Sequence, residues 1–170
     1  PAGLAPQEGA LTSLNFRIGI SETIGLAGEA AASAFTRDLH ADPVDFDSPV
    51  PASIYRQNIS TRSDYAGTLA LAWDDGDFGV KTSGKYIGAG YVSLGYPYMQ
   101  PDRLEFLLAP RARFFDKKLS LNASIGHRTN NLSSTKGATS TQLIGSANAF
   151  ALISDEWSLA LRYANFGVRN

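Results

Sequence analysis

The feature that most restricts the fold of this chain is the regular alternation of apolar and polar side chains. It is clearest in residues 118–128, KLSLNASIGHR, where Leu119, Leu121, Ala123 and Ile125 fall on one parity. Serine, asparagine, glycine and arginine residues fall on the other parity. Because successive side chains of a β-strand point to opposite faces, this pattern predicts a strand with one apolar and one polar face.

The same alternation can be followed, with varying strength, along most of the chain. The predicted strands cover about residues 11–20, 23–37, 64–73, 78–91, 103–115, 118–128, 141–153 and 157–168. Segment 23–37 is alanine-rich and could also be helical, although Gly25 and Gly28 weaken a helix. Pro110 interrupts its segment and predicts a bulge or a sheet edge there. We therefore expect an all-β fold, an antiparallel up-and-down meander of about eight long strands.

The connections between these segments alternate between short and long. Short connections rich in Asp, Gly and Ser are expected at residues 21–22, 74–77, 116–117 and 154–156. Long connections rich in Pro, Asn, Ser, Thr and Asp are expected at about 38–63, 92–102 and 129–140. Short turns on one side and long loops on the other are typical of outer-membrane β-barrels, and segments of about 10 to 14 residues can cross a bilayer as tilted strands. We expect residues 1–170 to be a single transmembrane β-barrel domain or a fragment of a larger barrel.

The strand directions favour the fragment. They place both ends of the chain on the side of the long loops, whereas a complete outer-membrane barrel normally keeps both ends on the periplasmic side. The sequence also opens on Pro1 rather than on methionine. The alternative to a fragment is a complete eight-stranded barrel of inverted topology. The alternative to any membrane barrel is a soluble secreted β-sandwich or small β-barrel that acts as a binding module, with the apolar parity turned into a core.

Composition excludes several classes of protein. The chain has a net charge of −1 and no cysteine, so nucleic-acid binding is not expected, and neither a disulfide nor a thiolate metal site can form. No uncharged apolar stretch approaches the roughly 20 residues that a membrane helix needs. The expected partner is a lipid bilayer, with other envelope proteins or a plug or periplasmic domain as further candidates.

Aromatic residues gather near both ends of the predicted strands. Two such levels are typical of the interfacial girdles of membrane barrels, although aromatic residues also favour strands in general. The candidate girdle residues are Tyr65, Tyr91, Tyr96 and Tyr98 near the long loops, and Trp73, Phe78, Phe114 and Trp157 beside the short turns.

The polar parity carries many basic residues and few acids. If this parity faces a lumen, the basic residues there are Arg17, Lys81, Lys85, Arg103, Arg111, Arg113, Arg128 and Arg162. The acids on the same parity are Glu29 and Glu105. A basic lumen favours anions or a plug with an acidic surface. The alternative is that these arginines pair with carboxylates on strands outside this chain.

Catalytic and metal-binding signals are weak. The histidines are His40 and His127, and the chain has no GxSxG motif, so we expect no enzymatic activity and no cofactor. Loop residues Asp42, Asp45 and Asp47 form a weak candidate calcium site, but the full 12-residue calcium-loop pattern is absent. Solvated loop acids are the simpler interpretation.

The second half of the chain resembles a known family. The segments GYVSLGYPYMQPDRLEF and KLSLNASIG, the loop start R-x-NNL and the closing Y-x-NFG are similar to those of large outer-membrane β-barrel proteins of the Bacteroidetes and related bacteria. The resemblance covers about residues 90–170, and its motifs mark turns and strand starts rather than catalytic residues. It implies a location in the bacterial outer membrane and a porin-like, structural or transport role, in a pore, in secretion or in surface display.

Overall fold

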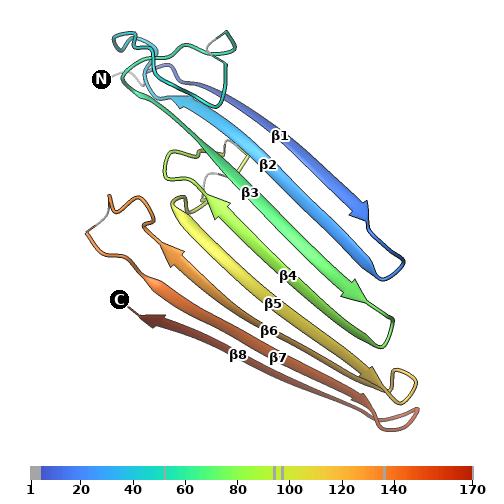
Figure 1. The fold of residues 1–170 in the computed structure, drawn as a ribbon. Helices are drawn as coiled ribbons and strands as arrows, with labels where there is room; N and C mark the ends of the chain where they lie inside the picture. The colour runs from blue at the N-terminus through green and yellow to red at the C-terminus, as the bar shows by residue number, and fades with distance from the viewer. Residues whose placement is uncertain (1–4, 52, 94, 97, 136, 170) are drawn as a thin grey trace.

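The chain folds into one antiparallel sheet of eight strands (Figure 1). The computed structural model describes residues 5–51, 53–93, 95–96, 98–135 and 137–169. The strands are β1 (Glu8–Gly19), β2 (Ile24–Thr36), β3 (Thr61–Asp74), β4 (Phe78–Ile87), β5 (Arg103–Phe114), β6 (Leu119–Asn130), β7 (Thr141–Leu152) and β8 (Ser158–Arg169). Each strand pairs with its neighbour in sequence, so the prediction of an eight-stranded meander is confirmed.

Some predicted boundaries and alternatives were wrong. Strand β4 ends at Ile87 rather than at residue 91, because the chain leaves the sheet at Gly88. The helical alternative for residues 23–37 is excluded, since β2 pairs with β1 on one side and with β3 on the other. Pro110 forms no bulge: the register between β5 and β6 is the same on both sides of it, and only the pairing of residues 109 and 110 with β6 is lost. A proline removes one N–H from the ladder, which explains a local gap without a shift.

The sheet is open. Strands β1 and β8 lie at its opposite margins and do not pair with each other, so the described residues do not form a closed barrel (Figure 1). Tight turns join β1 to β2, β3 to β4, β5 to β6 and β7 to β8 at one end, which we call the tight-turn end. The three long connections lie at the other end, which we call the loop end.

The register keeps the two parities apart on the two faces of the sheet. Residues opposite each other in an antiparallel ladder lie on the same face, and Ile18, Leu26 and Leu71 follow one another in this way. The face that carries them is called the apolar face, and the opposite one the polar face. Large side chains of the apolar face are Leu14, Phe16, Ile18, Leu26, Tyr65, Leu69, Leu71, Trp73, Phe78, Val80, Tyr86, Leu104, Phe106, Leu108, Phe114, Leu119, Leu121, Ile125, Leu143, Leu159, Leu161 and Tyr163.

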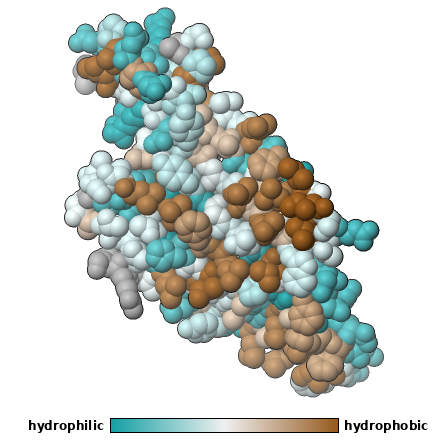
Figure 2. All heavy atoms as spheres, in the orientation of Figure 1, coloured by the Kyte–Doolittle hydropathy of each residue, from teal (hydrophilic) through white to brown (hydrophobic). Residues whose placement is uncertain are grey.

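No layer of the described chain covers most of the apolar face. Leu14 is 71% exposed and Leu161 60% exposed, and hydrophobic surface is concentrated over the strands (Figure 2). The buried core is a small cluster of Ala32, Ala34, Val50 and Tyr55, where loop 37–60 packs on the loop end of β2. In soluble proteins, one face of an antiparallel sheet is commonly buried against a hydrophobic core, and most of the apolar face of this sheet is not buried in this way.

The tight-turn end is staggered across the sheet. Ile24 is the first residue of β2. The residue of β8 that lies level with it across the ladders is Tyr163, whereas β8 begins about five residues earlier, at Ser158. With about 3.3 Å per residue along a strand and about 4.8 Å between strands, this stagger inclines the strands by about 30° to the normal of the tight-turn edge. Such a stagger is the geometry of sheets that belong to tilted-strand barrels.

Candidate functional site

The polar face is the candidate functional site because almost all charged strand residues lie on it. All eight basic residues predicted for a lumen are brought to this one face by the register. The two predicted acids Glu29 and Glu105 lie there too, together with Asp64 and Asp74 of β3. Sequence reasoning did not single out these last two carboxylates, although their parity marked them.

Near the loop end, charges of opposite sign alternate across the sheet. The register places Glu29, Thr68, Lys85, Glu105 and Arg128 in one row over strands β2 to β6. Arg128 Nε donates to Glu105 Oε2 at 2.8 Å, in an ion pair whose side chains are largely shielded from solvent. This row is close to neutral, so the basic character of the polar face does not arise here.

Near the tight-turn end, the balance is strongly basic. Among the described strand residues, five basic side chains lie there against a single carboxylate, that of Asp74. The five are Arg17, Lys81, Arg111, Arg113 and Arg162. Asp74 forms an ion pair with Arg111, and Arg113 Nη1 donates a long hydrogen bond of 3.4 Å to the carbonyl oxygen of Gly76. The predicted basic wall is therefore restricted to this half of the face, and one of its members is paired within the chain.

Arg103 occupies a separate position at the loop end. It lies opposite Asn130 in the β5–β6 ladder. Arg103 Nε and Asn130 Oδ1 are both buried and have no hydrogen-bond partner among the described atoms.

The loop between β4 and β5 folds onto the polar face. Gly90 N–H donates to Asp64 Oδ2 at 3.0 Å, and Val92 N–H donates to Ser33 Oγ at 3.0 Å. Both acceptors are side chains of the polar face, and Ser33 is buried as a result. Loop 88–102 therefore covers the loop end of the polar face.

Glycine is required where this loop leaves the sheet. A Cβ atom at Gly88 would lie 2.1–2.3 Å from the carboxylate atoms of Asp64, and one at Gly90 would lie 2.8 Å from the carbonyl oxygen of Ser63. Because these distances are shorter than any van der Waals contact, the close approach of the loop depends on both glycines.

Tyr91 is the residue that this loop buries. It is 8% exposed and lines a small hollow together with Glu29, Lys85 and Met99. Burial, and to a lesser extent the negative charge of Glu29, raises the pKa of the Tyr91 hydroxyl above its usual value. The neutral phenol is thus the favoured form in this site.

A further set of hydrogen bonds joins two of the long loops. Asp102 is the last residue of loop 88–102. It accepts two hydrogen bonds from Ser133, one from the backbone N–H at 2.9 Å and one from the hydroxyl at 2.8 Å. The N–H of Asn131 also donates to the carbonyl oxygen of Asp102 at 2.8 Å. The connections at the loop end are therefore ordered by specific long-range bonds.

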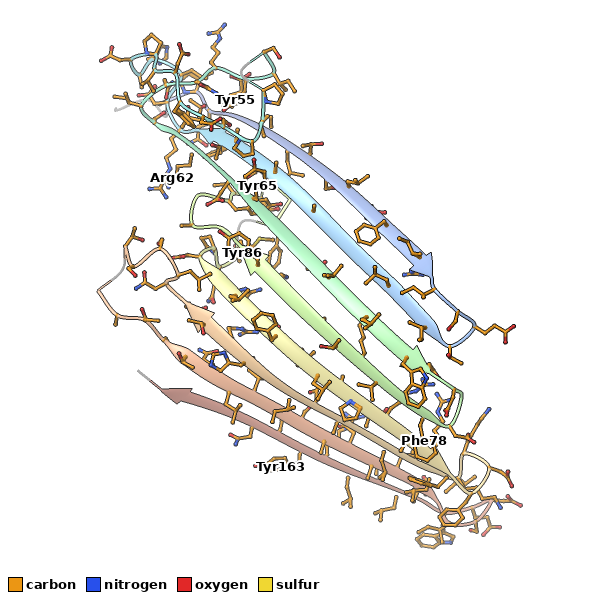
Figure 3. All side chains as sticks on the ribbon, in the orientation of Figure 1. Tyr55, Arg62, Tyr65, Phe78, Tyr86 and Tyr163 are labelled. Carbon is orange, nitrogen blue, oxygen red and sulfur yellow. The ribbon has the colours of Figure 1, made fainter. Side chains whose placement is uncertain are left out.

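Half of the eight predicted aromatic residues lie on the apolar face, and the other half lie in connections. Those on the face are Tyr65 near the loop end and Trp73, Phe78 and Phe114 near the tight-turn end. Phe78 and Phe114 meet edge to face at 5.6 Å at the tight-turn end, where Trp73 and Trp157 are also exposed. Tyr65 lies near the loop end, Tyr96 and Tyr98 are exposed in loop 88–102, and Tyr91 is buried against the polar face. Tyr86 and Tyr163 were not selected from the sequence, although their parity places them on the apolar face (Figure 3).

Other candidate sites do not gain support from their neighbours. His127 lies on the apolar face between Phe106 and Leu143, without an acid or a serine opposite it. Within the described ranges, no three His, Cys, Asp or Glu side chains are grouped so that they could hold a metal ion, so Asp42, Asp45 and Asp47 are not brought together as ligands. The described residues also include no helix long and apolar enough to cross a membrane.

Comparison with known proteins yields no match to a family model, to a curated protein or to a solved structure.

Proposed function

We propose that this chain forms part of the wall of a transmembrane β-barrel in a bacterial outer membrane. The apolar face contacts lipid, and the polar face lines an aqueous interior. The role is then that of a pore, a secretion channel or a surface-display platform, as the resemblance of residues 90–170 to Bacteroidetes outer-membrane barrels implies.

The observation that carries the proposal is the absence of charge from an exposed face. Among the strand residues whose side chains are described, the only Asp, Glu, Lys or Arg on the apolar face is Glu8, at the loop end of β1. The rest of this face is uncharged over the full width of the sheet, and the described chain covers it only where loop 37–60 packs on the loop end of β2. An exposed apolar surface of this extent needs an apolar environment.

The height of the apolar face fits a bilayer. Apolar positions run from Tyr65 to Trp73 on β3 and from Leu119 to Ile125 on β6. At about 3.3 Å per residue and a tilt of about 30°, the β3 run rises about 23 Å, close to the apolar band of about 25 Å that membrane barrels present to lipid. Aromatic side chains at both ends of the face agree with this boundary.

A soluble binding module is the second candidate, and one feature of the apolar face favours it. The apolar face contains a hollow of about 710 Å³. It is lined by the alanines at positions 112, 123, 147 and 149 and by the larger side chains Trp73, Phe78, Leu121, Leu161 and Tyr163. A lipophilic ligand could occupy this hollow in a soluble protein. In a membrane wall, lipid acyl chains fill the same space.

The solvent requirement of the fold separates the two candidates. Far-UV circular dichroism of the purified chain is recorded in plain buffer and in detergent micelles, beside a gel of boiled and unboiled samples. We expect the strand signal and a heat-dependent gel shift only with micelles. A cooperative monomeric β-fold in plain buffer would contradict the membrane assignment and favour the binding module.

A matched pair of substitutions tests which face contacts lipid. Leu121→Arg places a charge on the apolar face, whereas Ser120→Arg places the same charge on the polar face of the same strand. Since a charge near the bilayer midplane costs about 2–4 kcal/mol in membrane barrels, we expect Leu121→Arg to lose micelle-dependent, heat-modifiable folding and Ser120→Arg to keep it. Leu161→Arg on β8 should behave like Leu121→Arg, since Leu161 lies in the same row of the sheet, opposite Ala149. If Leu121→Arg and Ser120→Arg fold equally well, or fail equally, the assignment of the apolar face to lipid is contradicted.

A further inference from the structure

We infer that Arg111, Asn122, Asn148 and Arg162 form a binding row on the polar face for small anions with several oxygen acceptors, of the class of phosphate compounds. The inference rests on the proposed function, because the polar face then lines a water-filled interior along which solutes move.

The sheet register builds this row from four consecutive strands. Arg111 of β5 lies opposite Asn122 of β6, Asn122 opposite Asn148 of β7, and Asn148 opposite Arg162 of β8. Directly opposite residues share a face and have Cβ atoms about 5 Å apart. The four backbone positions therefore span about 14 Å, with an arginine at each end and two asparagines between them. The Arg111 side chain extends outward from this strip, past Gly79 of β4 to Asp74 of β3.

The side chains in this row suit an oxygen-rich anion. Each guanidinium presents a fork of N–H donors that matches the oxygens of phosphate or carboxylate, and each carboxamide adds two N–H donors. The two like charges do not lie on adjacent strands, so the asparagines separate them without adding a negative charge. A ligand that extends along the whole row would contact hydrogen-bond donors from each of the strands β5, β6, β7 and β8.

The surroundings of the row leave positive charge uncompensated. Lys81 and Arg113 lie on the same half of the polar face, and Asp74 is the one strand carboxylate there. Asp74 holds Arg111 at its terminal nitrogen, while the buried Nε of Arg111 has no partner among the described atoms. The loop-end row differs, since Glu105 neutralises Arg128 there and Glu29 faces Lys85 across Thr68.

Nuclear magnetic resonance of the asparagine carboxamides tests the row without requiring a conducting pore. The full chain is folded in zwitterionic micelles and titrated with inorganic phosphate at constant ionic strength, with chloride as the comparison. We expect a saturable shift of the side-chain amide signals of Asn122 and Asn148 with phosphate and no saturable shift with chloride.

Two arginine variants with the same loss of charge provide the control. Arg162→Gln removes an end of the row, whereas Arg17→Gln removes a cation of the same face on β1, far from the row. We expect Arg162→Gln to weaken phosphate binding about tenfold, the loss expected for one charged hydrogen-bonding group, and Arg17→Gln to leave it within about twofold. If Arg162→Gln does not fold, Arg162→Lys keeps the charge without the fork and should still weaken binding.

Asp74→Asn tests the assigned geometry from the opposite side. The carboxylate of Asp74 competes with an incoming anion for Arg111, so its neutralisation should tighten phosphate binding. Weaker binding in this variant would contradict the row.

The outcomes separate this inference from the proposed function. Micelle-dependent folding without a saturable phosphate shift overturns the anion row and leaves the membrane assignment intact. Equal losses in Arg162→Gln and Arg17→Gln also overturn it, since they would reflect net charge alone. Folding in plain buffer together with phosphate binding at the row would support the anion-binding row and contradict the membrane assignment.

Discussion

Gly88 is the residue at which β4 ends and the loop turns onto the polar face. We expect Gly88→Ala to lower the free energy of unfolding by about 1–3 kcal/mol, because its Cβ would collide with the Asp64 carboxylate and break the bond from Gly90 to Asp64. The measurement is urea unfolding in micelles. Gly95→Ala is the control, since nothing lies within 4 Å of a Cβ there, and it should change stability by less than about 0.5 kcal/mol. Equal effects of the two substitutions on the free energy of unfolding would contradict the importance of the close contact at Gly88.

At the same scale, the sequence predicts which face a strand residue occupies but not which partner it finds. The parity of Leu121, Arg111 and Asp74 follows from a period of two, which is a local property of a strand. The ion pair between Arg111 and Asp74 joins residues 37 positions apart and depends on the stagger of β3, β4 and β5. Tyr91 was assigned to an aromatic girdle because it lies near a loop, whereas its burial depends on bonds to β2 and β3.

At the scale of elements, the strands and the places of the tight turns were predictable, whereas the conformations of the connections were not. The eight strands have a repeated local pattern, and each lies within a few residues of its predicted position. The turn after β5 was expected at residues 116–117, but its conformation has no local signal. Phe115, Asp116 and Lys117 all have positive φ angles of 52–69°, and none of them is glycine. Loops 37–60 and 88–102 take their shape from long-range contacts, such as the bond between Val92 and Ser33, which no local pattern encodes.

Loop 88–102 should respond to alkaline pH through Tyr91. Its raised pKa means that the folded chain favours the neutral phenol more than the unfolded chain does. The stabilisation is therefore fully present below about pH 10, the ordinary tyrosine pKa, and is lost as the pH rises through the higher pKa of the folded chain. We expect Tyr91→Phe to lose less stability above pH 10 than the parent chain, measured by urea unfolding across the pH range. Tyr98→Phe is the control for the loss of a tyrosine hydroxyl, since Tyr98 belongs to the same loop and is 86% exposed.

At the scale of the whole molecule, the open edges and the stagger belong to the same geometry. Strand β1 runs toward the tight-turn end and β8 runs away from it, so each edge can accept a further antiparallel neighbour. In lipid, an unpaired backbone edge costs several kcal/mol for each unsatisfied group, and a wall placed in a bilayer must therefore be continued on both sides. The period-two pattern predicts the faces of such a wall, but closure depends on strand number and shear, which no single strand encodes.

The tilt of the strands is the prediction that tests this geometry as a whole. If the tight-turn edge lies along one membrane surface, the stagger from Ile24 on β2 to Ser158 on β8 inclines the strands by about 30° to the bilayer normal. Polarised attenuated-total-reflection infrared spectroscopy of the chain in oriented bilayers measures this angle from the dichroism of the amide I and amide II bands. We expect a mean strand tilt of about 30°, close to the range of about 35–45° that membrane barrels occupy. Leu121→Arg, which should not insert, is the control and should give no ordered dichroism. Strands parallel to the membrane plane in the parent chain would place the sheet on the bilayer surface, and the polar face would then contact bulk water rather than line a channel.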